Sequence, residues 1–206
     1  MRPVVDTIER LRTPRLWLQA PRVDLAPGVT EFLRRNRAHF APWDPPASPQ
    51  VTSVAFQRGA LREAARAFAD GSAYRWWLSP EAAPLEVIGS IHFSNLARGA
   101  FHSATLGYSL DVEAVGQGLM TEALRCAIDV VFSPLVNLHR IQASWRPTNL
   151  RSGAVLQRLG FHDEGLARDY LYIDGRWRDH RIVALLNPAF IAPPEWPVGP
   201  VGRTDR

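Results

Sequence analysis

The sequence predicts an α+β (mixed α/β) domain with a mainly antiparallel sheet, on three observations. Short alternating apolar runs and longer runs of helical spacing follow one another as strand, helix, helix, three strands, helix, strand, helix and two strands. The strand-rich first half disfavours a doubly wound nucleotide-binding fold. A chain of 206 residues suits one domain with a full core. We therefore expect about seven strands and four helices in a single domain over 1–187, with a proline-rich tail over 188–206.

The elements of the first half follow from alternation and from residues typical of helix ends. The aromatic and proline-rich stretch between the first two helices predicts a loop. Asp24 is the expected N-cap of the first helix, and Asp70-Gly71 ends the second. In order, we expect a strand over 15–20, a helix over 24–37, a loop over 39–46, a helix over 52–70, and strands over 75–78 and 86–93.

The second half is predicted in the same way. We expect a strand over 104–111, a helix over 119–132, a strand over 138–146, a helix over 149–159, a hairpin over 170–177 and a last strand over 181–186. Asn149 is the expected cap of the short helix and Gly160 its stop. Asp174-Gly175 predicts the hairpin turn. From Asn187 onward, five prolines and few apolar residues predict a loosely held tail.

A glycine-containing loop, Val115-Gly116-Gln117-Gly118, leads from the fourth expected strand into the helix at Leu119. Free backbone N–H groups and the helix dipole at such a point favour phosphate or pyrophosphate. Neither a Walker-type motif nor the dinucleotide fingerprint fits, because Thr121 stands where the third glycine belongs. An ordinary tight turn is the alternative interpretation of this loop.

A second stretch, Asn149-Leu150-Arg151-Ser152, begins a helix that closes on Leu159-Gly160-Phe161. By themselves Asn149 and Ser152 are an ordinary N-cap and a polar residue of the first turn. Together with the glycine loop, this N-x-x-S helix resembles the GNAT family of acetyl-CoA-dependent N-acetyltransferases. The resemblance covers nearly the whole chain except its termini.

The likeness narrows to the RimJ/RimL branch, whose members acetylate ribosomal proteins, and the closing segment most resembles its RimJ side. The matching segments are Thr13–Leu18, Asn36–Pro45, Phe93–Asn95, Leu106–Leu110, Gly116–Met120, Asn149–Gly153, Leu159–Phe161 and Asp169–His180. Three positions depart from the family. Val115 stands where Gln or Arg is usual, Met120 where Gly or Ala is frequent, and Leu171 near the glutamate of RimL-type relatives.

The resemblance implies a GNAT-like twisted sheet, acetyl-CoA as cosubstrate, no metal, and transfer to a protein N-terminal amine, such as the alanine of a ribosomal protein. It implies Ser152 and Asn149 as catalytic residues, with Ser152 protonating the departing thiolate. Asp44 is added as a catalytic candidate because its aromatic loop would border an acceptor groove. Trp43, Asp44 and Tyr108 are the implied acceptor contacts. The implied coenzyme contacts are Leu110, Asp111, Val112, Gly116, Gln117, Gly118, Leu119, Met120, Thr121, Asn149 and Ser152.

An α-amino group, with a pKa of about 7.7 to 8.0, needs only a modest base to become nucleophilic, whereas lysine, near 10.4, needs a stronger one. The candidates for this base are Asp44, Asp169, Asp111 and His92. Asp44 can equally be a turn residue before a proline, and His92, in an apolar strand, is more typical of a structural histidine.

The tryptophans and the cysteine divide by context. Trp76, Trp145 and Trp177 lie in strand-like runs and are expected in the core, whereas Trp43 is expected to line the acceptor site. Cys126, the single cysteine, excludes an internal disulfide and is expected to be a packed, inert thiol.

The composition, 46% apolar and 21% charged, is typical of a globular protein, and no apolar run is long enough for a membrane span. No secretory signal is recognised, so we expect a cytoplasmic monomer or homodimer. The net charge of +4 is carried by arginine alone, since lysine is absent, and suits an anionic ligand or ribosome association.

Two alternative functions stay open. One is a small-molecule or antibiotic N-acetyltransferase, and the other is a non-catalytic CoA-binding ribosome-assembly factor.

Overall fold

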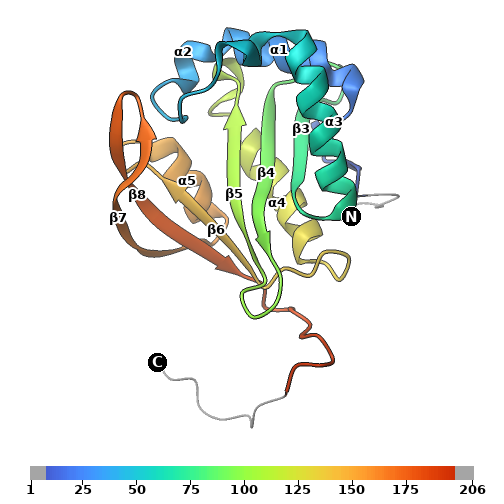
Figure 1. Cartoon of the computed structure of the whole chain (residues 1–206), viewed down its shortest axis with the longest axis vertical. Helices are drawn as coiled ribbons and strands as arrows, with labels where there is room; N and C mark the ends of the chain where they lie inside the picture. The colour runs from blue at the N-terminus through green and yellow to red at the C-terminus, as the bar shows by residue number, and fades with distance from the viewer. Residues whose placement is uncertain (1–7, 198–206) are drawn as a thin grey trace.

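One twisted sheet of eight strands runs through the computed structural model, which describes residues 8–197 (Figure 1). The strand order is β1-β2-β3-β4-β5-β6-β8-β7, and β5 with β6 is the parallel pair while every other neighbouring pair is antiparallel. The strands are β1 Arg10–Arg12, β2 Leu16–Gln19, β3 Tyr74–Pro80, β4 Gly89–Ala97, β5 Ser103–Leu110, β6 Arg140–Trp145, β7 His162–Ile173 and β8 Arg176–Leu186. The predicted mainly antiparallel α+β architecture is confirmed.

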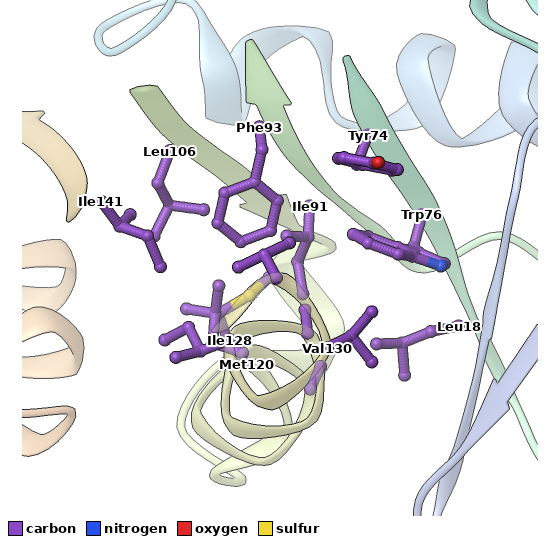
Figure 2. Packing of buried hydrophobic residues seen from close by; sticks show 14 of the residues in the cluster. Leu18, Tyr74, Trp76, Ile91, Phe93, Leu106, Met120, Ile128, Val130 and Ile141 are labelled. Carbon is purple, nitrogen blue, oxygen red and sulfur yellow. The ribbon is translucent and has the colours of Figure 1, made fainter. Parts of the chain in front are cut away.

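Five α-helices flank the described sheet: α1 Ala26–Arg35, α2 Arg37–Phe40, α3 Val54–Asp70, α4 Leu119–Phe132 and α5 Leu150–Arg158. The bounds of α4 match the prediction because its apolar residues recur on one face. Ala123, Leu124, Ala127 and Val131 of this face are fully buried. They pack on the sheet against Ile91, Phe93, Leu106 and Ile141 to form the main core (Figure 2).

A second, smaller core lies between the opposite face of the sheet and the helices α1 and α3. It contains Leu25, Val29, Phe32, Leu61 and Trp77, all nearly or fully buried. Trp76 and Trp77 therefore belong to different cores, as alternation along a strand requires. No helix in residues 8–197 is long and apolar enough to cross a membrane.

The fold adds one strand and one helix to the prediction. The strand β1 has three residues and the helix α2 has four, both too short to give a periodic signal. The helix α2 begins at the last residue of the expected first helix and ends two residues into the expected loop over 39–46. Asp24 does not cap α1; its carboxylate pairs with Arg22, and Leu25 occupies the N-cap position.

The C-terminal strands also differ from the prediction. The expected hairpin and last strand are one long pair, β7 and β8, joined by the predicted Asp174-Gly175 turn. Irregular register between Asp163 and Gly165 and between Ala167 and Leu171 obscures the alternation of β7. Trp177 is not in the core: the hairpin extends beyond the helices, and this side chain is 58% exposed.

The segment after β8 is not loosely held over its first part. The amide of Asn187 donates to the carbonyls of Phe132 and Leu138, and Asn137 exchanges hydrogen bonds with the backbone of Ile191. Phe190 packs edge-on against His102 and His139. Because prolines do not prevent such contacts, composition alone was misleading here. Residues 198–206 of the predicted tail lie outside the described residues.

Candidate acetyl-CoA and acceptor site

The sheet opens between β5 and β6, and a cavity of about 1080 Å³ lies at the opening. The two parallel strands pair only from Ser103–Arg140 to Leu106–Ala143, so the last four residues of β5 pair with β4 alone. Backbone groups on the free edge of Gly107–Leu110 can therefore bind an extended ligand. The cavity walls come from the end of β5, the glycine loop, α4, α5 and the segment 39–44.

The glycine loop forms one end of the cavity. Gly116 and Gly118 have φ of 81° and 77°, the left-handed region that favours glycine, and Gly118 is the N-cap of α4. Arg15 fixes the loop, because it donates to the carbonyl of Gln117 at 3.0 Å and to Glu122 at 2.7 Å. The N-terminus of a fourteen-residue helix thus faces the cavity with its N–H groups held in place, as pyrophosphate binding requires.

Asn149 and Ser152 meet Tyr108 on the α5 side of the cavity. The side-chain oxygen of Asn149 accepts the N–H of Ser152 at 3.2 Å, so the predicted cap is confirmed. Tyr108 Oη donates to the carbonyl of Ser152 at 3.0 Å, and the two hydroxyl oxygens lie 2.8 Å apart. Burial raises the pKa of Tyr108 to about 12, although the Ser152 hydrogen bond opposes the shift, so the phenol stays protonated at neutral pH.

Close packing holds α5 against β6. A Cβ on Gly153 would lie 2.7 to 2.9 Å from ring atoms of Trp145, so a glycine is required after Ser152. Trp145 is half-buried and packs on the main core, which agrees with its predicted position. The Ser152 hydroxyl is therefore positioned by a rigid contact and by the helix cap together.

Trp43 and Asp44 line the opposite end of the cavity, beyond α2. Crowding by protein atoms raises the pKa of the Asp44 carboxyl to about 6, although the residue remains exposed to solvent. Arg146, just after β6, donates to the carbonyl of Pro42 and lies over the Trp43 ring, with its Cζ 5.4 Å from the ring centroid. Asp44 thus lines the same cavity as Ser152, with a proton affinity suited to a base near neutral pH.

Comparison with known proteins decides the family. A model described as an acetyltransferase (GNAT) domain matches residues 15–162. The chain belongs to the GNAT acetyltransferase family. It is 39% identical over 180 residues to the ribosomal protein uS5-alanine N-acetyltransferase of Escherichia coli, covering 87% of this chain and 91% of the relative.

Two solved structures agree with this assignment. The ribosomal-protein-S5-alanine acetyltransferase of Vibrio fischeri is 32% identical with a TM-score of 0.85, covering 89% of this chain and 99% of that one. RimJ of Mycobacterium smegmatis, solved with a CoA disulfide, is 33% identical with a TM-score of 0.76, covering 90% of each chain. The protein is an acetyl-CoA-dependent N-acetyltransferase of the RimJ/RimL branch.

Most of the predicted site residues of this GNAT enzyme line the cavity. They are Trp43, Asp44, Tyr108, Leu110, Gly116, Gly118, Leu119, Met120, Thr121, Asn149 and Ser152. The side chain of Met120, the departure from the usual small residue, is 5% exposed and turns into the core, so it does not obstruct the loop (Figure 2).

Three predicted coenzyme contacts, Asp111, Val112 and Gln117, lie outside the cavity walls. Although burial opposes the shift, hydrogen bonds from Asn36, the Glu113 N–H and Arg35 lower the pKa of Asp111. Asp111 therefore braces the end of β5 against α1 and is neither a base nor a side-chain ligand. Val112 is 46% exposed, and the Gln117 side chain turns back to the carbonyl of Glu113.

Two other candidate bases are also excluded by position, since neither lines the cavity. The ring of His92 packs on Gly107, its Nδ1 is buried without a hydrogen-bond partner, and burial together with Arg75 lowers its pKa to about 4. Asp169 is an exposed residue with φ of 46° at the irregular part of β7, where its N–H binds Asp179. Asp44 is the remaining candidate.

Sequence inspection missed three arginines in the cavity walls, Arg125 on α4 and Arg151 and Arg158 on α5. Helical spacing could have indicated them, because Arg125 follows Thr121 by four residues and Arg158 follows Arg151 by seven. Their positive charge suits the phosphates of acetyl-CoA. They bring positive charge to a cavity whose glycine loop has Val115 where the family usually has Gln or Arg.

Cys126 is a half-buried residue of α4, and burial with the neighbouring Asp129 raises the pKa of its thiol to about 11. It therefore stays a protonated, packed thiol, as expected. Within residues 8–197 no group of three or more His, Cys, Asp or Glu side chains is placed to hold a metal ion.

Proposed function

We propose that this enzyme acetylates the α-amine of a protein N-terminus, and that the acceptor is the N-terminal alanine of a ribosomal protein. The named activity of the Escherichia coli and Vibrio fischeri relatives supports this acceptor. The observation that carries the proposal is the shared cavity, whose walls bring Trp43 and Asp44 together with the glycine loop and Ser152. A pKa raised to about 6 makes the Asp44 carboxyl a suitable base there. An enzyme of this function works in the cytoplasm, where ribosomal proteins are made and can be met before or on the ribosome.

In this proposal Asp44 takes the proton of the α-ammonium, directly or through water. The neutral amine then attacks the thioester carbonyl, and backbone N–H groups on the free edge of Gly107–Leu110 stabilise the oxygen as it becomes negative. Asp44 releases that first proton to solvent, and as the amide forms it accepts, through water, the second proton that the nitrogen must lose. The carbon–sulfur bond breaks in the same step, and Ser152 gives its proton to the thiolate. Tyr108, 2.8 Å from Ser152, restores that proton from solvent.

A peptide competition tests the acceptor. A peptide that begins with alanine should be acetylated at least tenfold faster than the same peptide with a blocked N-terminus and one free lysine, because a base of pKa about 6 deprotonates an α-ammonium more readily than a lysine. Thiol release and intact mass measure both rates. Faster labelling of the lysine, or of small amines and antibiotics, would refute the substrate claim. Coenzyme binding without any transfer would favour the assembly-factor alternative.

Asp44→Asn should remove the break near pH 6 from the pH profile. In the native enzyme kcat/KM should fall as pH drops through about 6, because only ionised Asp44 accepts a proton. In the variant kcat/KM should be low and should follow only the free-amine fraction of the peptide, with no additional break near pH 6, while acetyl-CoA affinity stays unchanged.

The same substitution gives a test that does not depend on activity. Folding raises the pKa of Asp44 above its ordinary value near 3.8. The protonated carboxyl therefore costs no stability below about pH 4, whereas its ionisation destabilises the folded protein as pH rises through 6. Asp44→Asn should therefore raise Tm at pH 7 and leave it unchanged below pH 4. If kcat/KM of Asp44→Asn keeps the native fall near pH 6, another residue is the base.

A further inference from the structure

An arginine cluster borders the acceptor end of the cavity. It consists of Arg146, just after β6, together with Arg176 and Arg178 from the start of β8. The turn of the β7–β8 hairpin rises beside the α2 segment (Figure 1), and Arg146 reaches the residues after α2 by donating to the carbonyl of Pro42. The cluster therefore surrounds the approach to Asp44 from the hairpin side.

Strand register places these hairpin cations on one face of the sheet. Trp145 pairs with Arg181, so alternation along β8 sends Arg176, Arg178 and His180 to the opposite face, the face of α1 and α2. Burial together with the neighbouring Arg178 and Arg176 lowers the pKa of Arg146, with Asp174 opposing, as expected of cations held close together. His180 is 3% exposed, and burial is the main cause that lowers its pKa.

Positive charge in this cluster exceeds negative charge. Arg178 is paired with Asp174 at 2.7 Å, and the other carboxylate at the approach is Asp44 itself. Within residues 8–197 no ion pair forms with Arg146 or Arg176. Asp179 points to the other side of the strand, where it accepts the N–H of Asp169. A cationic segment of acceptor is therefore repelled here and an anionic one attracted.

We propose that the acceptor carries an acidic side chain among the residues that follow its free α-amine, and that Arg146 and Arg176 select it. This inference rests on the proposed function. An extended peptide advances roughly 3.3 to 3.6 Å per residue, so an amine at Asp44 brings residues 2 to 5 of the acceptor past the arginine cluster. Trp43, stacked with Arg146, gives the intervening backbone an aromatic surface.

Three peptides that begin with alanine and differ only in Glu, Gln or Lys at position 4 test this selection. For the wild-type enzyme, kcat/KM should be about 3- to 5-fold higher with Glu than with Gln and lower still with Lys. High salt should reduce these differences, because the cluster is open to solvent. The ratio between peptides is the readout, so a loss of activity common to all three does not mimic it.

Arg176→Gln should abolish the preference for Glu, and Arg176→Glu should reverse it in favour of Lys. Arg176 is exposed and forms no ion pair in the described part, so neither change should unfold the protein. Arg181→Gln is the matched control, since Arg181 lies on the same strand, faces the other side and pairs with Asp163. It should leave the Glu-to-Gln ratio as in the wild type.

Equal kcat/KM for Glu and Gln in the wild-type enzyme would overturn the selection and leave the proposed function standing. If single-stranded RNA then inhibited the wild type but not Arg176→Glu, the arginine cluster would be a nucleic-acid surface instead. Failure to acetylate any of the three peptides would overturn the proposed function, and the selection with it.

Discussion

Replacing Ser152 with alanine should lower kcat by about a hundredfold, while the dissociation constant of acetyl-CoA changes by less than about threefold. The expected loss is large because the Ser152 hydroxyl is the proton donor proposed for the departing thiolate. Its partner Tyr108, 2.8 Å away, is held protonated by a pKa of about 12. Steady-state kinetics and calorimetric titration with CoA separate the two quantities.

Tyr108→Phe and Asn149→Ala are the controls for this prediction. Tyr108→Phe should reduce kcat less, by about tenfold, because Ser152 keeps its own proton and loses only the group that restores it. Asn149→Ala removes the helix cap and should cost about 1 kcal/mol of stability. Full turnover of Ser152→Ala at every pH would reduce Ser152 to a part of the helix cap. A larger loss with Tyr108→Phe would make the phenol the acid.

The parts of the site that sequence analysis predicted correctly are set by local rules. Gly118 has the left-handed backbone that its loop suggested, and α4 has the bounds that its apolar spacing gave. Asn149 caps α5 as its position before a helical run predicted. In each case the determining contacts lie within a few residues of sequence.

The errors concern residues whose environment is set by distant segments. The family resemblance implied Asp111 as a coenzyme contact, but Arg35 and Asn36 reach its carboxylate from the end of a separate helix. Trp177 has the alternation of a core strand, yet alternation fixes only a face and not what covers that face. The raised pKa of Asp44 likewise depends on crowding by protein atoms from other segments, which a turn before a proline does not reveal.

The contrast between local and distant contacts also explains Val115, which stands where the family usually has Gln or Arg. A loop without a cationic side chain still presents the N–H groups of α4, and Arg125, Arg151 and Arg158 bring positive charge to the same cavity from two helices. We therefore expect backbone geometry to carry the recognition of pyrophosphate, with side-chain charge supplied from outside the loop. Coenzyme binding should therefore be most sensitive to changes in the backbone conformation of the glycine loop.

Gly118→Val should weaken acetyl-CoA binding by at least about tenfold while the protein stays folded. Gly118 has a φ of 77°, where a β-branched residue is strained, so the loop must change its path and turn its N–H groups from the pyrophosphate. Overpacking is not the cause, because a Cβ there would meet nothing closer than Arg15 Nη2 at 3.8 Å. Calorimetric titration and a melting curve measure the two effects.

Gly175→Val is the matched control for this strain. Gly175 has a φ of 74° in the hairpin turn, also has open space at its Cβ, and lies outside the cavity walls. Both variants should lose comparable stability, and only Gly118→Val should lose coenzyme affinity. Unchanged affinity in a folded Gly118→Val enzyme would remove the glycine loop from the coenzyme site. Equal losses of affinity in both variants would mean that strain acts through global stability, since the hairpin turn does not contact the coenzyme cavity.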